Sequence, residues 1–454
     1  MVSPRKACRT ASSMLSFVGC LAYVCCPVLA QLQWANAATS PGKFSSLLSS
    51  PEEAGDLAPV VLIPGVGGTQ LHARLTNEYR SSSFLCWNWG YTDYFQLWLD
   101  MGGILPPFTQ CFAGRMQLIY NPSTKRFRNA PGVNTEVSYF GSTRAMEYLD
   151  PKLKCATAYL ASLVNNLKQN GYIDGKTLFG APYDFRYAPG PNAADVAVDY
   201  LKNLKNLIET ASSSNDDKPV VLVAHSLGAL WTLYLLNQQP IEWRQKYVGR
   251  FIGISAPWGG SVLEMLIYAS GYAEGVPIID PLVLRAGQRS IESNLWLLPV
   301  KRVFNSSILV STPSKEYTAF DLEDFFIDIG YPQAISQYAT RVPYLIDQLQ
   351  APLVPVTLIF GQGVQTPQSL IYKHCGFNYR PDIVYGDGDG KVNLESLTAV
   401  ISDWADVKGQ ALKVIRLLDQ THSTVVTSPD GVSVIVDEIM KECVPVNTSR
   451  STLR

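Results

Sequence analysis

The sequence has little charge and little histidine. Charged residues make up 17% of its 454 residues, the formal net charge at pH 7 is −1, and there are four histidines. This charge balance argues against a nucleic-acid-binding protein, which needs a basic face. The scarcity of histidine also leaves few candidates for any reaction that uses an imidazole base.

Long hydrophobic runs are missing after residue 30. The apolar run Met14–Ala30 is shorter than the ~20 residues of a membrane-spanning helix and contains Pro27. Basic residues precede the run, and Ala35-Asn36-Ala37 fits the small-x-small pattern of a signal-peptidase site. We therefore predict a cleaved signal peptide at 1–37, with an uncleaved membrane anchor as the alternative.

Cysteines are few in the predicted mature chain. The signal peptide predicts that this chain enters the secretory pathway and is either secreted or held in a lysosomal or vacuolar lumen. Five remain after the signal peptide: Cys86, Cys111, Cys155, Cys375 and Cys443. That compartment is oxidising and permits disulfides, but an odd number leaves one thiol free or intermolecular. Sequons at Asn305 and Asn447 are compatible with glycosylation.

Short apolar runs alternate with helical patterns through the rest of the chain. The predicted strands are Ala58–Ile63, Pro219–Ala224, Phe251–Ser255, Val354–Phe360 and Ala411–Leu418, and the predicted helices are Tyr159–Lys168 and Asp195–Thr210. Strands that alternate with helices indicate a doubly wound α/β fold with a mostly parallel central sheet. We place this domain at 58–443, between a flexible N-terminal segment at 38–57 and a C-terminal tail at 444–454.

One of these strands ends in Ala224-His225-Ser226-Leu227-Gly228, and an apolar helical pattern follows. A small-x-Ser-x-Gly turn between strand and helix is how an α/β-hydrolase exposes a nucleophilic serine, because bulk at the flanking positions would clash. Ser226 is therefore the candidate nucleophile. The alternative is a serine that only caps a helix.

A serine nucleophile needs a histidine base and a carboxylate, which follow it in the chain in this fold. His72 precedes Ser226, and His225 adjoins it and should point away, so His422 and His374 remain. His422 follows the last apolar run and is preferred. Asp389, in the turn Asp387-Gly388-Asp389-Gly390, is the preferred acid. A calcium loop is the alternative, but the EF-hand ligand pattern is missing.

The oxyanion of acyl transfer needs preorganised N–H donors. The residue after the nucleophile, Leu227, supplies one, and the glycine-rich loop Pro64–Gly68 is placed to supply the other from Val66. A nucleotide-binding loop is the weaker alternative, because the Gly-Lys-Ser/Thr ending and the full Gly-x-Gly-x-x-Gly spacing are absent. No cofactor or metal ion is expected.

From about Pro59 to about Met440 the chain resembles the lecithin:cholesterol acyltransferase and lysosomal phospholipase A2 family. The resemblance rests on the elbow, the Asp389 loop and an ordered series of further motifs: Ile63-Pro64-Gly65, Trp98-Leu99-Asp100, Asn129–Val133, Glu147–Asp150, Ala181–Arg186 and Ser255–Gly260. By position, the family's triad falls on Ser226, Asp389 and His422, and its oxyanion donors fall on Val66 and Leu227.

The resemblance also implies how the enzyme reaches lipid. It implies a Cys86–Cys111 disulfide and a membrane-binding cap at about 84–145, where Trp87 and Trp89 contact the membrane. It further implies a mobile lid loop at about 271–289, for which an ordinary surface connection is the alternative. Trp258 is a candidate for the lining of the acyl pocket. Packing in the protein core is the alternative role for each of these tryptophans.

We therefore expect an enzyme that takes an acyl chain from a glycerophospholipid onto Ser226 and passes it to water or to a lipid alcohol, a sterol or a ceramide. Its expected partner is a phospholipid membrane or a lipoprotein surface. The alternatives are a neutral-lipid or general carboxylesterase, and a catalytically inactive lipid-binding protein.

Overall fold

The structure is a computed structural model that describes residues 57–81, 83–86, 93–274, 276–346, 349–374 and 376–441. The predictions for the signal peptide, Trp87, Trp89, Asn447 and the C-terminal tail fall outside the described residues.

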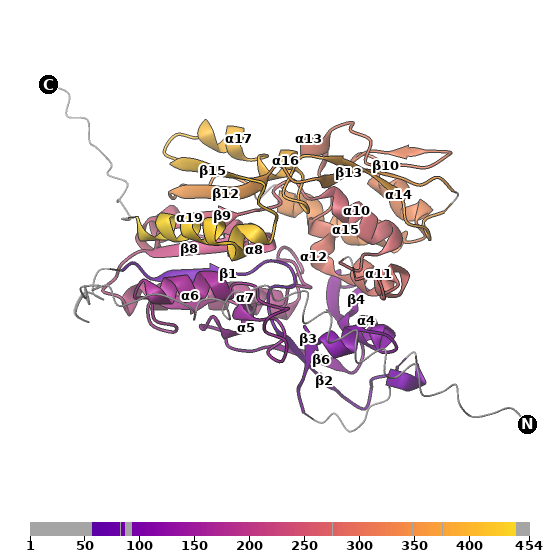
Figure 1. Ribbon diagram of the computed structural model, residues 1–454, viewed down its shortest axis with the longest axis horizontal. Coiled ribbons are helices and arrows are strands. Elements are labelled where there is room, and N and C mark those ends of the chain that lie inside the picture. The colour runs from indigo at the N-terminus through magenta and orange to yellow at the C-terminus, as the bar shows by residue number, and fades with distance from the viewer. Residues whose placement is uncertain are drawn as a thin grey trace, which may run out of the picture.

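A six-stranded parallel sheet lies at the centre of the fold (Figure 1). Its strands, in spatial order, are β15 (Leu412–Leu418), β12 (Val356–Gln362), β9 (Val248–Ile254), β8 (Val220–His225), β1 (Val60–Ile63) and β7 (Leu178–Gly180). The five predicted strands are confirmed to within a few residues. β7 was not predicted, because three apolar residues are too short a run to identify a strand.

Both faces of this sheet are covered at its centre, which explains why strands such as β1 and β8 are almost entirely apolar. Val60 and Leu62 belong to one buried cluster and Val61 and Ile63 to the other, as the two-residue period of a strand requires. The first cluster is closed by α6 (Ala161–Gln169), α18 (Thr424–Thr427) and α19 (Pro429–Met440), and the second by α7 (Asp195–Ser213) and α8 (Leu227–Asn237).

A smaller antiparallel region follows β1 and holds the predicted cap. Its three-stranded sheet has the order β3 (Phe95–Trp98), β2 (Leu71–Leu75) and β6 (Val133–Val137). Its other elements are η2 (Phe84–Cys86), α3 (Met101–Ile104), α4 (Thr109–Met116), the hairpin β4 (Leu118–Asn121) and β5 (Arg126–Asn129), and α5 (Arg144–Glu147). A Cys86–Cys111 disulfide joins η2 to α4. Cys155 is also disulfide-bonded.

A buried ion pair attaches this cap to the main domain. Arg186 lies just after β7 and pairs with Asp184 at 2.6 Å, and both side chains are almost fully buried. The Nη2 of Arg186 also donates to Asn129 in β5 and to Thr135 in β6. The guanidinium and carboxylate are therefore fully hydrogen-bonded within the protein, which is the condition for burying such a pair.

The predicted lid segment, about 271–289, differs from the prediction in its second half. Residues Pro281–Ser290 form helix α11, which packs against α4 of the cap and against α10 (Val262–Ser270). The side chain of Asp280 caps this helix by accepting a hydrogen bond from the Leu282 N–H, and Pro281 occupies its first position. The connecting loop therefore ends at Asp280.

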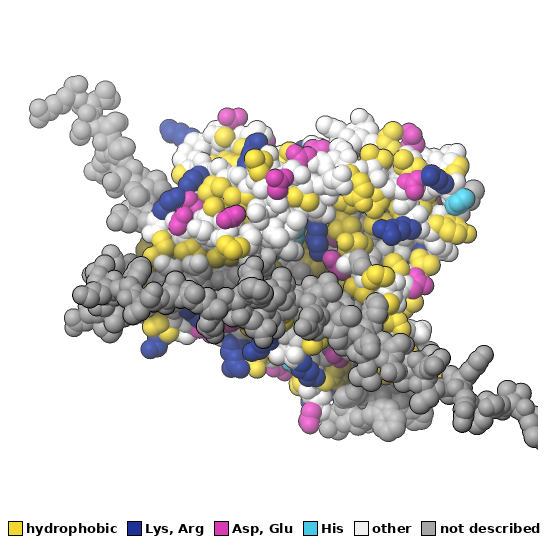
Figure 2. Space-filling model, viewed as in Figure 1, with side chains coloured by type: hydrophobic (Ala, Val, Ile, Leu, Met, Phe, Trp, Pro, Cys, Tyr) yellow, Lys and Arg dark blue, Asp and Glu magenta, His cyan; other side chains and the backbone are white. Residues whose placement is uncertain are grey.

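The remaining described elements lie outside the central sheet and the cap. They are α9 (Ile241–Tyr247), α12 (Glu292–Trp296), α13 (Lys301–Phe304), α14 (Leu322–Asp328), α15 (Gln333–Ile346), α16 (Leu394–Leu397), α17 (Ile401–Ala405) and a small sheet of β11 (Glu316–Tyr317), β10 (Val310–Ser311), β13 (Thr366–Ile371) and β14 (Asp382–Gly386). Acidic and basic side chains are interspersed on the visible face (Figure 2). Among the described residues, no helix is both long and apolar enough to cross a bilayer.

Candidate active site

Ser226 lies at the junction of β8 and α8, in a backbone conformation that side chains rarely adopt. Its φ is 54° and its ψ is −128°, and it precedes the first residue of α8. A Cβ atom on Gly228 would lie 2.4 Å from the carbonyl oxygen of Pro64, so only glycine fits there. The elbow therefore brings Ser226 against the glycine-rich loop that follows β1.

Three aromatic side chains hold this loop, which we call the oxyanion loop (Pro64–Gly68). Tyr183 donates its hydroxyl to the carbonyl of Pro64 at 3.0 Å, and Trp98 of the cap donates its indole N–H to the carbonyl of Gly67 at 2.6 Å. The Tyr159 hydroxyl accepts the N–H of Gly65 at 3.0 Å. The loop also passes close above the nucleophile candidate, because a Cβ atom on Gly65 would lie 2.7 Å from the Ser226 Cβ.

These contacts leave particular N–H groups of the loop available. The N–H of Gly65 is bonded to Tyr159, and that of Gly68 is bonded to the carbonyl of Gly65. Within the described part of the chain, the N–H groups of Val66 and Leu227 have no acceptor. Both belong to segments that flank Ser226, and their role as oxyanion donors stays a prediction.

Asp389 and His422 form a buried pair. The Nδ1 of His422 lies 2.7 Å from the Oδ2 of Asp389, and the His422 backbone N–H donates to the Asp389 carbonyl, also at 2.7 Å. The other carboxylate oxygen accepts the N–H groups of Lys391 at 3.0 Å and Val392 at 2.8 Å. Burial favours a higher pKa for Asp389, but the attraction and hydrogen bond of His422, together with the N–H groups of Val392 and Lys391, outweigh it, so the net pKa is lowered.

The alternative acid and base lie elsewhere. Asp387 is exposed, and its carboxylate accepts the N–H groups of Gly363 and Gly388. His374 is also exposed and packs against Tyr379. The structure therefore pairs the two residues that were preferred from the sequence, Asp389 and His422.

His225 does not point away from the site as predicted. Its ring lies 4.8 Å from the ring of His422, centroid to centroid, and its Nε2 lies 3.0 Å from the His422 carbonyl oxygen. His225 immediately precedes Ser226, so this contact brings the His422 loop next to the elbow. Tyr159, which hydrogen-bonds to the other ring nitrogen of His225, was not predicted as a site residue either.

Comparison with known proteins identifies the family of this chain. Residues 94–343, more than half of the chain, match the profile described as lecithin:cholesterol acyltransferase. The chain belongs to the lecithin:cholesterol acyltransferase family. It is 44% identical over 400 residues to lecithin-cholesterol acyltransferase-like 1 of Arabidopsis thaliana, covering 86% of this chain and 90% of that protein.

Animal members of the family are also similar. Lysosomal phospholipase A and acyltransferase of Canis lupus familiaris is 38% identical, with 79% of this chain and 87% of that protein covered. Phosphatidylcholine-sterol acyltransferase of Homo sapiens is 36% identical, with 82% of each covered. The solved structure of the Tle4–Tli4 complex is similar in fold, with a TM-score of 0.53 at 14% identity, and the match covers 85% of this chain and 98% of that one.

The structure also describes two other predicted site residues, Trp258 and Asn305. Trp258 is 3% exposed and packs edge-on against Trp404 at 5.3 Å between centroids, so it lies in the core and not on a membrane-facing surface. Its contact with an acyl chain stays a prediction. Asn305 is exposed directly after α13, which leaves its side chain accessible for the predicted glycosylation.

A charged cluster links the acid loop to the segment before α11. Lys391, two residues after Asp389, pairs through its Nζ with Glu274 at 2.9 Å. Glu264 in α10 lies near both, is 7% exposed, and has a carboxylate oxygen without a hydrogen-bond partner in the described part of the protein. Burial, followed by the negative charge of Glu274, raises the pKa of Glu264 from its ordinary value of 4.5 to about 8, although the positive charge of Lys391 opposes the shift.

We expect Glu264→Gln to weaken the pH dependence of stability. Because the folded-state pKa is raised, the stabilising contribution of protonated Glu264 is complete below pH 4.5 and is lost as the pH rises toward 8. Each pKa unit corresponds to ~1.4 kcal/mol, so the variant should be more stable at pH 8 by a few kcal/mol. Urea unfolding at pH 4.5, 6 and 8 measures this, with Glu323→Gln as the exposed control. If the free energy of unfolding changed with pH by the same amount in wild type and in Glu264→Gln, the prediction would be wrong.

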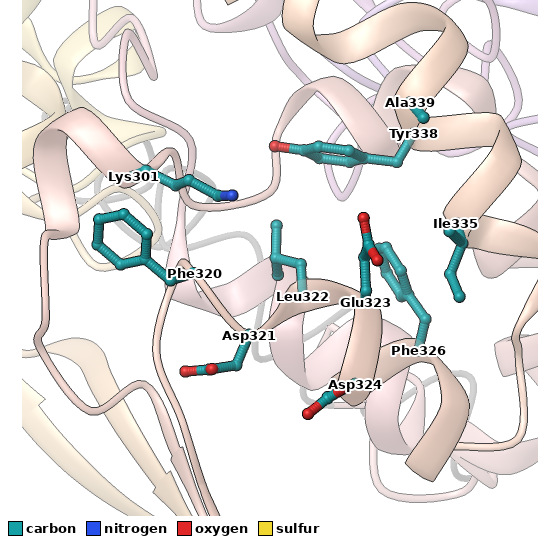
Figure 3. Close-up of a pocket in the computed structure, with 10 residues that line it drawn as sticks. All are labelled: Lys301, Phe320, Asp321, Leu322, Glu323, Asp324, Phe326, Ile335, Tyr338 and Ala339. Atoms are coloured by element: carbon teal, nitrogen blue, oxygen red, sulfur yellow. The ribbon is translucent and has the colours of Figure 1, made fainter.

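The structure also has a cavity of about 230 Å³ between α13, α14 and α15. The side chains of Lys301, Glu323 and Tyr338 point toward it (Figure 3). Its lining includes no residue of the candidate site, so the cavity is separate from that site.

Proposed function

We propose that this protein transfers a fatty acyl chain from a glycerophospholipid to Ser226 and then to water or a lipid alcohol. The observation that carries the proposal is the 2.7 Å contact between His422 and Asp389 beside the Ser226 elbow. Membership of the family makes the chain an enzyme of the phospholipase or acyltransferase type. The serine mechanism and the choice of acceptor are our inference.

In the first half-reaction, the Ser226 Oγ attacks the ester carbonyl carbon while the Nε2 of His422 takes the hydroxyl proton. The N–H groups of Val66 and Leu227 bind the oxyanion of the tetrahedral intermediate. The intermediate then collapses, the ester C–O bond breaks, and His422 protonates the departing lysophospholipid. Asp389 holds the Nδ1 proton of His422 throughout, so that Nε2 is the nitrogen that exchanges protons.

In the second half-reaction, water or an alcohol attacks the acyl-enzyme and gives its proton to His422. Collapse of the second intermediate returns that proton to Ser226 and releases either a fatty acid or a new ester. The relatives include a lysosomal phospholipase A and acyltransferase and phosphatidylcholine-sterol acyltransferases, which supports testing water and sterols as acceptors. A ceramide is the second lipid alcohol to test. A secreted or lysosomal location accords with the predicted signal peptide.

Product analysis tests this function. Phosphatidylcholine liposomes that contain a sterol or, separately, a ceramide analogue are incubated with wild type and with Ser226→Ala. Free fatty acid that depends on Ser226 identifies a phospholipase, and a Ser226-dependent steryl ester or acylceramide identifies an acyltransferase. Hydrolysis of soluble esters with no phospholipid turnover would favour a general carboxylesterase, and no turnover of either would favour a lipid-binding protein.

The cap is the proposed membrane contact. Around the Cys86–Cys111 disulfide the described residues expose large apolar side chains, with Phe84 82% and Phe108 47% accessible. Exposed aromatic and aliphatic groups gathered at one site suit a lipid interface. The predicted contact residues Trp87 and Trp89 lie three and five positions after Phe84 in the sequence.

We expect Trp87→Ala with Trp89→Ala, and separately Phe84→Ser with Phe108→Ser, to lower liposome binding by at least about tenfold. Removing apolar area costs ~25 cal/mol per Å², so two aromatic side chains supply the necessary 1.4 kcal/mol. Hydrolysis of a soluble ester should stay unchanged. Liposome co-sedimentation measures the first and an esterase assay the second.

Phe320→Ser is the matched control, because Phe320 is 55% exposed but precedes α14, far from the cap. Equal losses of liposome binding and soluble esterase activity would show that the cap variants damage the fold and not a membrane contact.

A further inference from the structure

A chain of hydrogen bonds runs behind Ser226 from the oxyanion loop to the candidate base. The N–H of Gly65 donates to the Tyr159 hydroxyl at 3.0 Å, and this hydroxyl lies 2.7 Å from the Nδ1 of His225. The Nε2 of His225 lies 3.0 Å from the carbonyl oxygen of His422. The chain therefore joins three segments that are distant in sequence and that must keep a fixed separation around Ser226.

The chemistry of the end groups fixes every proton in this chain. The His422 carbonyl can only accept, so the Nε2 of His225 must carry hydrogen. In the neutral ring Nδ1 is then an acceptor, so the Tyr159 hydroxyl must donate to it. That hydroxyl keeps a lone pair for the Gly65 N–H, and all bonds run in one direction, from Gly65 through Tyr159 and His225 to His422.

Two further contacts connect His422 to Asp389, the candidate acid. The His422 backbone N–H donates to the Asp389 carbonyl, and its Nδ1 faces the Asp389 carboxylate. Burial and the neighbouring His422 lower the pKa of His225 to about 3, and burial raises the pKa of Tyr159. Both groups therefore stay neutral at mildly acidic and neutral pH, and the tautomer of His225 does not change.

We propose that Tyr159 and His225 are positioning residues that set the distance between the oxyanion donors and the imidazole of His422. Neither needs to touch the substrate. Tyr159 occupies the Gly65 N–H and so orients the loop with the Val66 N–H free, while His225 holds the backbone of His422. This inference rests on the proposed function, because it concerns how the same site is preorganised.

Three variants test it. Tyr159→Phe removes both bonds of the hydroxyl. His225→Gln keeps a donor near the position of Nε2, whereas His225→Leu keeps none. Tyr172→Phe is the matched control, since Tyr172 is also a buried tyrosine. It donates to the carbonyl of Ala58, which precedes β1, whereas the oxyanion loop follows β1.

For each variant we would measure kcat and KM on a soluble nitrophenyl ester, the rate of labelling by a fluorophosphonate, and the thermal unfolding midpoint. Tyr159→Phe should lower kcat and the labelling rate about 10- to 100-fold, as small misplacements of reacting groups do, with KM within about threefold. Tyr172→Phe should leave them within about twofold. His225→Gln should keep about tenfold more kcat than His225→Leu.

Equal kcat in Tyr159→Phe and Tyr172→Phe would overturn the inference, and so would equal kcat in His225→Gln and His225→Leu. If Tyr159→Phe does not fold, the comparison of the two His225 variants decides. Fluorophosphonate labelling separates the two proposals. If wild type is not labelled, or if Ser226→Ala is labelled equally, the proposed function fails. If labelling depends on Ser226 but the Tyr159 and His225 variants are unaffected, only the positioning role fails.

Discussion

Ser226→Ala should reduce kcat on phospholipid by about 10⁵- to 10⁶-fold, which is the scale seen when a triad serine is removed. The elbow forms the only acyl-accepting hydroxyl that our mechanism uses, so no partial activity through an acyl-enzyme should persist. Folding should change little, because alanine keeps the Cβ atom and the backbone at φ 54° is no more strained for alanine than for serine. Fatty acid release and fluorophosphonate labelling measure the loss, and a thermal melt measures the fold.

Ser255→Ala is a close control for this change. Ser255 follows the neighbouring strand β9, has a positive φ of 46° and is fully buried. Its hydroxyl has no hydrogen-bond partner among the described residues, so removing it costs little. Activity that survives in Ser226→Ala but disappears in Ser255→Ala would reject Ser226 as the nucleophile.

The parts of the site that the sequence predicts are those that are determined by residues next to one another in the sequence. The elbow is visible because a buried strand, a serine and small neighbours are contiguous, and Gly228 is required by the Pro64 carbonyl that it approaches. The same holds for the central strands, whose two buried faces give unbroken apolar runs. The glycine-rich oxyanion loop also follows such a run directly.

The parts that the sequence does not predict depend on distant contacts. Tyr159 reaches Gly65 across 94 positions and His225 across 66, and no local pattern marks either partner. The interpretation of His225 as pointing away considered only its place in the elbow. Helix α11 was missed for a different reason: the glycines and prolines of its segment suggested a loop, although Asp280-Pro281 is a helix-start signal.

Replacing Asp389 by asparagine tests whether this residue fixes the tautomer of His422, because its two carboxylate oxygens face different kinds of group. One oxygen accepts the N–H groups of Lys391 and Val392, and the other faces the Nδ1 of His422. In Asp389→Asn, an amide nitrogen turned toward the two N–H groups would lose two hydrogen bonds. The amide N–H₂ should therefore face His422 and make Nδ1 the acceptor.

That arrangement moves the imidazole proton to Nε2, the nitrogen that must accept the proton of Ser226. We expect kcat to fall about 10⁴-fold, as it does when the aspartate of a serine triad is replaced by asparagine, while the fold is preserved. Steady-state kinetics on a soluble ester measure the fall, and the fluorophosphonate labelling rate should fall with it, because both steps need a base at Nε2.

Asp387→Asn is the control, since Asp387 is exposed, lies two residues earlier and accepts only backbone N–H groups of Gly363 and Gly388. It should change kcat by less than about threefold, because it does not reach His422. A large loss in Asp387→Asn together with a small one in Asp389→Asn would assign the acid to Asp387. A small loss in both would mean that His422 keeps its tautomer without a carboxylate, which would remove Asp389 from the mechanism.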